Sequence, residues 1–431
     1  MGDMATSSKP RDLSLRTSPT FIDGVLLAAN AVRDAMLVFR GGTCLFERLV
    51  QVFEDHDLTH TLTAPDGQGR LILTFTDCSA MTMGASQVTE GLVGEGLKKL
   101  KPGLVMLAEF SMVTLSGEDL PSLARTLGRK HGLPVVAAAS RSLERDYVDA
   151  YESILGGIAE TLPDGAFAVR DADAVGLVGL LSERGEGDWE GNRQELERLA
   201  AALGLRLCPP WLCGGSYRDL ASVGQAPLLL ALPAGRRAAR AIARRSGARV
   251  LPVDLPVGIS GTAAWLRRLA AATGRAERAE RFIRAETAAL LPRLDRVLLR
   301  YLAGRRAALI VTEEWLRVLP DFFERELGIA VPVRMARQRA RPADGGAGRD
   351  YDASVDSINR RVAEARRGGG LDLVVGSSWE RHVLAPGSQG LPFLEFGYPC
   401  GGSHFLTPAP FLGFRGVLTW AEQLTQRLQG R

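Results

Sequence analysis

The sequence has few cysteines, and their spacing argues against two kinds of site. The chain of 431 residues contains five cysteines, which are Cys44, Cys78, Cys208, Cys213 and Cys400. No two of them form a Cys-x-x-Cys pair, so we expect no self-contained four-cysteine site for zinc or an iron–sulfur cluster. An odd number of cysteines in a long chain is also untypical of a secreted disulfide scaffold. We therefore expect a reducing compartment.

Long apolar runs and targeting signals are also missing. The first twenty residues are polar and contain Lys9, Arg11 and Arg16 without an apolar segment, unlike a signal peptide. No uninterrupted run of about 18 apolar residues is present to span a membrane. A formal net charge of +4 is small for this length and gives no reason to expect nucleic acid or a membrane surface as a partner. The sequence thus predicts a soluble, cytoplasmic protein with neither of these partners.

The chain has no nucleotide fingerprint. Neither GxxxxGK[ST] nor GxGxxG follows any predicted strand, so we expect this chain to bind no nucleotide itself. The arginines of the helix predicted at 236–245 lack interleaved aromatic residues. This pattern is typical of a solvated helix face rather than of a nucleic-acid patch.

Two further groups of residues have a metal or redox interpretation and a structural one. His56 and His60 lie beside Asp55 and Asp57 in a polar stretch. Metal ligation is one interpretation, but a hydrogen-bonded surface loop is the favoured one. The segment 208–213, Cys-Pro-Pro-Trp-Leu-Cys, has an unusual spacing and stiff prolines, and we interpret it as structural rather than as a redox or metal pair.

Short apolar runs alternate with amphipathic helical patterns along the chain. LILTFT at 71–76, LVMLA at 104–108 and AALIVT at 307–312 are typical of buried strands. A loop is predicted at 185–191 and a single helix at 313–327. Strands that alternate with helices indicate βαβ units and a parallel sheet. Because the pattern restarts twice, the sequence predicts an α/β fold of three consecutive doubly wound domains.

We place the domain boundaries where this alternation restarts. Residues 1–20 are expected to form a disordered N-terminal segment, 21–165 a first α/β domain and 166–275 a second. The Arg- and Glu-rich stretch at 276–302 is interpreted as a helical connector, and 303–431 as a third α/β domain. In such folds ligands bind at the carboxyl ends of the strands.

The candidate site is a glycine turn followed by the first cysteine. A buried strand is predicted to end in the run 37–40, after which Gly41 and Gly42 allow a sharp turn without a Cβ clash. Residues 45–53 have helical spacing, so Cys44 is expected near a helix N-terminus, where free N–H groups and the dipole favour a thiolate. Thiolates ligate metals and iron–sulfur clusters. A small cysteine packed under the turn is the alternative.

Several short motifs follow one another along most of the chain. They are Gly41-Gly42-Thr43-Cys44, Ala80-Met81-Thr82 with Gly91, Glu109-Phe110-Ser111-Met112 with Ser116-Gly117-Glu118-Asp119-Leu120, the stretch 256–266, Val375-Gly376-Ser377-Ser378, Leu391-Pro392, Phe396-Gly397-Tyr398-Pro399 and Leu412-Gly413-Phe414-Arg415-Gly416. In these motifs and their order the chain resembles the nitrogenase component 1 family. The resemblance implies three Rossmann-like domains.

The resemblance also implies a metal centre at Cys44 and its glycine turn. In the family this cysteine ligates a cluster that is shared between two homologous subunits. A catalytic subunit has three cluster cysteines in the first domain, whereas here Ser111 stands at one such position and Pro19 or Thr20 near another. Cys78 is displaced from the ligand positions. The chain thus resembles the β-type subunits, including that of the cofactor-assembly scaffold, in which one cysteine completes a partner's three ligands to a [4Fe–4S] cluster.

The implied partners are a homologous α-type component 1 subunit, within a heterotetramer, and a separate ATP-dependent iron protein. The implied function is a nitrogenase-like oxidoreductase subunit in low-potential electron transfer. Two alternatives stay open: a non-catalytic scaffold for metallocluster assembly, and a structural partner without a cluster, for which the missing cysteines are the reason. Cys400 and His404, near the C-terminus, are interpreted as structural.

Overall fold

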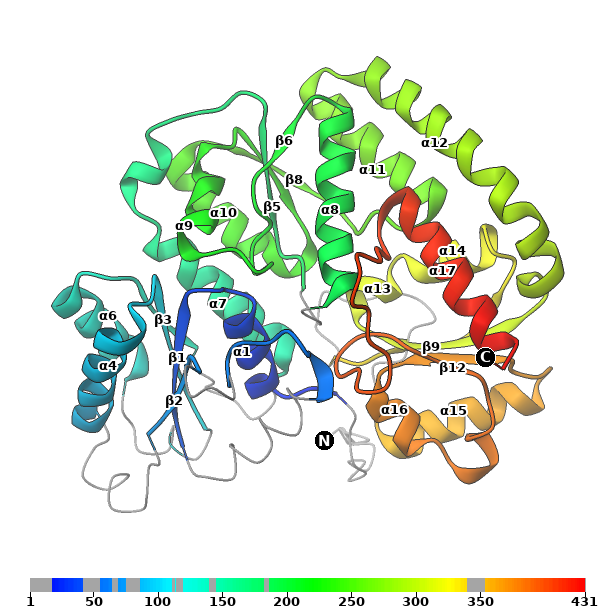
Figure 1. Cartoon of the computed structure of the whole chain (residues 1–431), viewed down its shortest axis with the longest axis horizontal. Coiled ribbons are helices and arrows are strands. Elements are labelled where there is room, and N and C mark those ends of the chain that lie inside the picture. The colour runs from blue at the N-terminus through cyan, green and yellow to red at the C-terminus, as the bar shows by residue number, and fades with distance from the viewer. Residues whose placement is uncertain are drawn as a thin grey trace, which may run out of the picture.

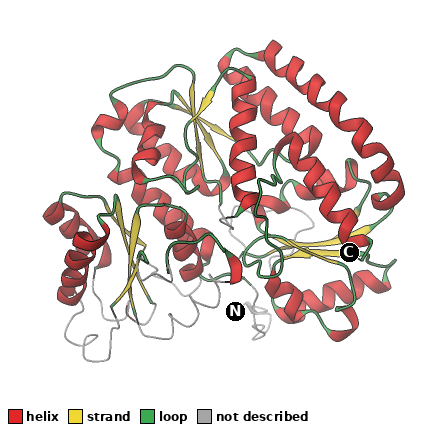
Figure 2. Ribbon diagram, in the orientation of Figure 1, coloured by secondary structure: helices red, strands yellow, loops and turns green. Residues whose placement is uncertain are grey.

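The computed structural model describes residues 18–41, 55–63, 69–74, 86–110, 113, 119–138, 145–181, 186–338 and 353–430. Three α/β domains surround a common centre, each with a sheet of four described, parallel strands (Figure 1). Helices flank each sheet (Figure 2). The predicted α/β fold of three consecutive Rossmann-like domains is confirmed, while the residue boundaries between the domains stay predictions.

The first sheet has the strand order β2-β1-β3-β4. Its strands are β1 (Ala35–Arg40), β2 (Leu71–Leu73), β3 (Leu104–Glu109) and β4 (Val135–Ala138). The flanking helices are α1 (Phe21–Asn30), α4 (Ser86–Leu100), α6 (Leu120–His131) and α7 (Tyr147–Thr161). Side chains of β1 alternate between the faces: Leu37 and Phe39 pack with α1 and α7, and Met36 and Val38 pack on the side of α4 and α6.

The second and third sheets repeat this arrangement, with strand orders β6-β5-β7-β8 and β10-β9-β11-β12. The strands of the second are β5 (Ala174–Val178), β6 (Arg206–Leu207), β7 (Leu228–Ala231) and β8 (Arg249–Pro252), and those of the third are β9 (Arg306–Val311), β10 (Ala330–Ala336), β11 (Leu373–Gly376) and β12 (Phe393–Glu395). The helices are α8 (Gly187–Ala202), α9 (Tyr217–Ala221), α10 (Arg236–Ser246), α11 (Gly258–Thr273), α13 (Glu313–Leu316), α14 (Leu319–Arg325), α15 (Val355–Arg367), α16 (Ser378–Val383) and α17 (Gly413–Leu428).

The helical stretch predicted at 276–302 is present as α12 (Ala276–Val297) and a π-helical turn, Leu298–Leu302. It packs against α11 and α17 along the outside of the molecule (Figure 1). Arg198 of α8 donates to both carboxylate oxygens of Glu286 on α12 at 2.8 Å, so the middle of this helix is tied to the second domain. Among the helices of the described ranges, none is long and apolar enough to cross a membrane.

Two local predictions were wrong. The loop predicted at 185–191 is largely helix, because α8 begins at Gly187, whose N–H donates to the Phe405 carbonyl at 2.5 Å. A Cβ at Gly187 would lie 2.1 Å from the Thr407 carbonyl oxygen, so a glycine that looks like a loop residue is required by packing. The single helix predicted at 313–327 is split into α13 and α14. Pro320, in the first turn of α14, lacks the N–H that would continue a longer helix.

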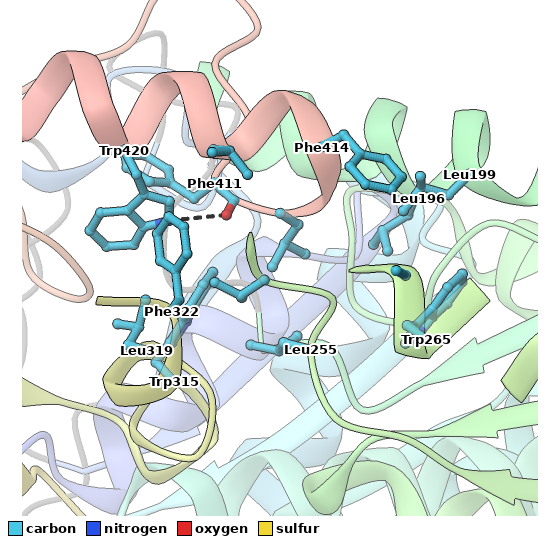
Figure 3. Packing of buried hydrophobic residues seen from close by; sticks show 14 of the residues in the cluster. Leu196, Leu199, Leu255, Trp265, Trp315, Leu319, Phe322, Phe411, Phe414 and Trp420 are labelled. Carbon is cyan, nitrogen blue, oxygen red and sulfur yellow. Dashed lines mark hydrogen bonds between the residues drawn. The ribbon is translucent and has the colours of Figure 1, made fainter. Parts of the chain in front are cut away.

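The largest apolar core joins the second and third domains. At its centre the Trp420 ring of α17 lies among the rings of Trp315, Phe322 and Phe411 (Figure 3). Its indole Nε1–H donates to the Phe411 carbonyl at 3.1 Å, so the polar atom of a fully buried tryptophan is satisfied. A second core joins the first and second domains, and Tyr398 of the third domain reaches into it.

Candidate functional site

The predicted site lies at the carboxyl edge of the first sheet. Gly41 directly follows β1, whereas Gly42, Cys44 and the helix predicted at 45–53 lie outside the described residues. Gly41 is buried, and a Cβ on it would lie 2.1 Å from Cδ2 of Phe110. The close approach of this ring therefore requires a glycine at position 41. The role of Cys44 as a ligand stays a prediction.

A buried ion pair stands beside this glycine. Arg40 ends β1 and Glu109 ends β3, and the two are register partners in neighbouring strands. Their NH1 and Oε2 atoms are 3.2 Å apart, with side chains 0% and 3% exposed. Burial lowers the pKa of Arg40, and the attraction of Glu109 opposes this effect. The Phe110 N–H donates to the Arg40 carbonyl at 3.0 Å, so both strand ends are held together where Gly41 begins.

Sequence reasoning did not single out this pair. Each residue closes an apolar strand, and a charged residue at that position is the signal that could have found it. Only the sheet register, however, reveals that Arg40 and Glu109 are opposite each other. Cys78 and Ser111, the other first-domain residues considered as ligands, lie outside the described residues.

The cysteines of the second domain are buried thiols. Cys208 and Cys213 are 0% and 4% exposed, and neither forms a disulfide. Burial raises the pKa of Cys213 to about 12 and also raises the pKa of Cys208. Both are protonated at neutral pH, which supports the structural interpretation of segment 208–213. Within the described ranges, no group of three or more His, Cys, Asp or Glu residues could hold a metal.

The stretch 55–63 is hydrogen-bonded and partly exposed, as its composition suggests, but two of its polar residues are buried. His56 and Asp57 are each only 1% exposed. Nδ1 of His56 accepts the N–H of Cys400 at 3.0 Å, and Oδ2 of Asp57 accepts from the Asn30 side chain at 2.9 Å. The loop therefore links the first domain to the C-terminal segment of the third.

One carboxylate connects all three domains. Glu186, which is 2% exposed, immediately precedes α8 of the second domain. Its Oε1 accepts the N–H of Leu58 from the first domain at 3.2 Å and lies 2.5 Å from Nδ1 of His404. Its Oε2 accepts the N–H of Phe405 at 3.2 Å. Sequence reasoning missed Glu186, because its partners are more than one hundred residues away.

Aromatic side chains fill the space between the second and third domains. Trp189, Trp315, Phe396 and Phe411 line a cavity of only about 40 Å³ there. That volume has room for about one water molecule. A larger cleft lies between loop 55–63 and the third domain.

Three parallel four-stranded sheets, each flanked by helices, define a protein built from three Rossmann-like domains. Residues 22–429 match the model of the family described as nitrogenase component 1 type oxidoreductase. This match extends over almost the whole chain, and the protein belongs to that family. The resemblance inferred from the sequence motifs is thereby confirmed.

Solved structures and a curated protein are similar to the chain. The structure described as "Nitrogenase Cp1 at pH 6.5" has a TM-score of 0.79 and 16% identity, covering 98% of this chain and 95% of that chain. "Nitrogenase Cp1 at pH 5" has a TM-score of 0.74 and 16% identity, over 98% and 90%. At such identity the likeness concerns the fold.

The light-independent protochlorophyllide reductase subunit N of Nephroselmis olivacea is 26% identical to the chain over 173 residues. The match covers 37% of this chain and 38% of that protein, so it spans less than half of the relative's length.

Proposed function

We propose that this chain is a β-type component 1 subunit that shares a [4Fe–4S] cluster with a homologous α-type partner. Cys44 supplies one ligand from the turn formed by Gly41 and Gly42, and the partner supplies three. A separate ATP-dependent iron protein delivers the electrons. Membership of the component 1 family supports the oxidoreductase class. The observation that carries the proposal is the rigid, buried sheet edge at Arg40 and Gly41, four and three residues before Cys44.

The donor set of the chain fits a shared cluster better than a self-contained one. A [4Fe–4S] cluster takes four ligands, usually thiolates. The pKa of about 12 of the buried Cys213 keeps that thiol protonated, and no metal-binding group of three is found in the described part of the chain. With five cysteines and no Cys-x-x-Cys pair in the sequence, the proposal assigns the other ligands of Cys44's cluster to the partner subunit. The buried thiols also suit the reducing conditions of a cytoplasm.

When bound, such a cluster accepts and releases single electrons at low potential. The contribution of this chain is a fixed, water-poor surface next to the cysteine turn. Phe110 fills the space over Gly41, and the hydrogen bond from Phe110 to Arg40 holds the end of β1. The Arg40–Glu109 pair is neutral overall, so it stiffens this edge without adding a net charge.

A non-catalytic role is the second candidate, and a specific observation favours it. Among the described residues, the cavity that Trp189, Trp315, Phe396 and Phe411 line between the second and third domains has about 40 Å³, too little for a substrate or a cofactor. In this reading the subunit completes a partner's site, either in an enzyme or in a scaffold on which a metallocluster is assembled. In the extreme form of this alternative, the subunit binds no cluster and has only a structural role in the complex.

Iron analysis tests these possibilities. The chain is purified without oxygen, alone and with its α-type partner, as wild type, Cys44→Ala and the matched control Cys208→Ala. We expect about four irons per heterodimer and an EPR signal that disappears in Cys44→Ala but not in Cys208→Ala. A complex without iron would overturn the shared cluster and leave the structural partner. Iron without turnover, when the iron protein and ATP are added, would favour the scaffold.

A further inference from the structure

A cleft of about 700 Å³ separates loop 55–63 from the third domain. It is lined by Asp55, His56, Ser378, Trp379, Arg381 and His382, together with Glu395, Pro399, Gly401 and Gly402. The cleft lies at the carboxyl ends of β11 and β12, where open α/β sheets bind ligands, and its volume is in the range of small-molecule sites. None of its lining residues belongs to a strand of the first sheet.

The floor of this cleft is preorganised. The Ser378 hydroxyl donates to Oε1 of Glu395 at 2.9 Å and accepts the N–H of Gly401 at 2.7 Å. Oε2 of Glu395 accepts the N–H of Gly402 at 3.1 Å. A carboxylate has about four acceptor positions, so these bonds leave capacity for a further donor.

The charges that face the cleft have both signs. NH1 of Arg381 is 3.8 Å from Oε1 of Glu395, and the Arg381 side chain, which lines the cleft, is 55% exposed. Asp55 is exposed on the opposite wall. One guanidinium therefore stands against two carboxylates among the lining residues described. A simple anion meets net repulsion in such a site, whereas an ammonium group is attracted to the carboxylates and a carboxylate attached to it has Arg381 as a partner.

The start of α16 offers few free backbone donors to a phosphate group. The N-terminus of α16 is already capped, because the Trp379 N–H donates to the Ser377 hydroxyl at 3.2 Å and the Ser377 N–H donates to Glu380 at 2.7 Å. Glu380 is also paired with Arg337 at 3.1 Å, with both side chains buried. The backbone donors that cradle phosphates elsewhere are thus engaged.

We propose that the cleft binds a small zwitterion, an α-amino acid with an apolar side chain. Its carboxylate pairs with the fork of Arg381, whose geometry suits a carboxylate. Its ammonium group lies toward Asp55 and Glu395. Its side chain packs against the half-buried indole of Trp379, which lines the same cleft. This assignment does not depend on a cluster at Cys44.

Three ligands of similar shape distinguish the contributions of the ligand's carboxylate and ammonium groups to binding. Isothermal titration of the full chain compares L-phenylalanine with phenethylamine, which lacks the carboxylate, and 3-phenylpropionate, which lacks the ammonium group. We expect L-phenylalanine to bind tightest and the loss of either group to weaken binding about tenfold or more. Absence of binding by all three, equal affinities, or tightest binding of phenethylamine or 3-phenylpropionate would each overturn the proposal.

Two substitutions test which residue binds the carboxylate of the ligand and which binds its ammonium group. Arg381→Gln is expected to weaken L-phenylalanine about tenfold and to leave phenethylamine unchanged. Asp55→Asn is expected to weaken both amines and to leave 3-phenylpropionate unchanged. Arg325→Gln removes an arginine that is 79% exposed on α14 of the same domain, and serves as the matched control. Full L-phenylalanine affinity in a folded Arg381→Gln variant contradicts the assignment. If a variant fails to fold, the wild-type probe series decides.

Discussion

The backbone N–H of Cys400 donates a hydrogen bond of 3.0 Å to Nδ1 of His56, across 344 residues of sequence. The imidazole ring also packs edge-on against Tyr398, with ring centroids 4.6 Å apart. An acceptor at Nδ1 needs a free lone pair there, so the imidazole is neutral in this contact. The first and third domains thus meet through a buried polar contact as well as through Tyr398.

Replacing His56 by leucine should therefore destabilise the protein. The substitution leaves the buried N–H of Cys400 without this acceptor, at a cost of about 1–3 kcal/mol. His56→Gln keeps an acceptor and should lose less. Urea unfolding monitored by circular dichroism measures both, with His60→Gln, in the same loop but only half-buried, as the control. Equal stability of His56→Leu and the wild type would show that the contact contributes nothing.

The buried pair at the edge of the first sheet should behave differently from an exposed pair. Arg40→Met leaves Glu109 charged and buried, and should cost about 3–5 kcal/mol, whereas the double variant Arg40→Met/Glu109→Leu should recover much of it. The exposed pair of Arg125 and Asp119, with side chains 66% and 57% exposed, provides the control. Arg125→Gln should change the free energy of unfolding by less than about 1 kcal/mol. Similar losses for Arg40→Met and Arg125→Gln would contradict the role of burial.

Gly41→Ala should be destabilising because of the Phe110 ring. Its Cβ would lie 2.1 Å from Cδ2 of Phe110, an overpacking expected to cost about 1–3 kcal/mol. In a Phe110→Ala background the same change should cost much less, which a double-mutant cycle measures. Gly91→Ala is the control, because a Cβ there meets nothing within 4 Å, and in helix α4 it should stabilise by about 0.5–1 kcal/mol. If Gly41→Ala costs as much stability in the Phe110→Ala background as in the wild type, the cause is backbone strain and not the Phe110 ring.

The buried thiol of Cys213 predicts a loss of stability at alkaline pH. Burial raises its pKa from 9.0 to about 12. Above pH 9 the unfolded chain releases this proton while the native state retains it, so the free energy of unfolding falls as pH rises. The loss approaches about 1.4 kcal/mol per pH unit until the native pKa is reached. Denaturant titrations at several pH values should give a shallower alkaline slope for Cys213→Ala than for the wild type. Identical slopes would mean that the thiol is not protected by burial.

Local sequence patterns predicted the strands and most helices of this protein. The run at 104–108 became β3 and the run at 307–312 became β9, and the helix predicted at 236–245 became α10, Arg236–Ser246. These predictions succeed because apolar side chains at a regular spacing create one buried face, and a buried face needs only nearby residues to be recognised. The predictions failed where contacts with distant residues determine the local structure. One example is the start of α8, which packs against residues near the C-terminus.

The contacts at the candidate sites have a different origin. Arg40 and Glu109 meet only because β1 and β3 pair in one register. Glu186 receives donors from Leu58 and Phe405, which approach it only when three domains have docked. His56 is polar and lies between aspartates, so its local pattern predicts exposure, yet it is buried against the third domain. Whether a side chain is buried and hydrogen-bonded here depends on residues from distant parts of the chain. A local sequence pattern contains no information about those residues.

By itself, then, the sequence determined the α/β class, the two restarts of the βαβ pattern and, through its motifs, the family. The order of apolar runs is enough for this, because parallel sheets form from strands that alternate with helices. The tertiary structure alone decided which charges are paired, which histidine is buried and where the clefts lie. Those features belong to surfaces that exist only after the domains have packed, since each is made of residues that the chain keeps far apart.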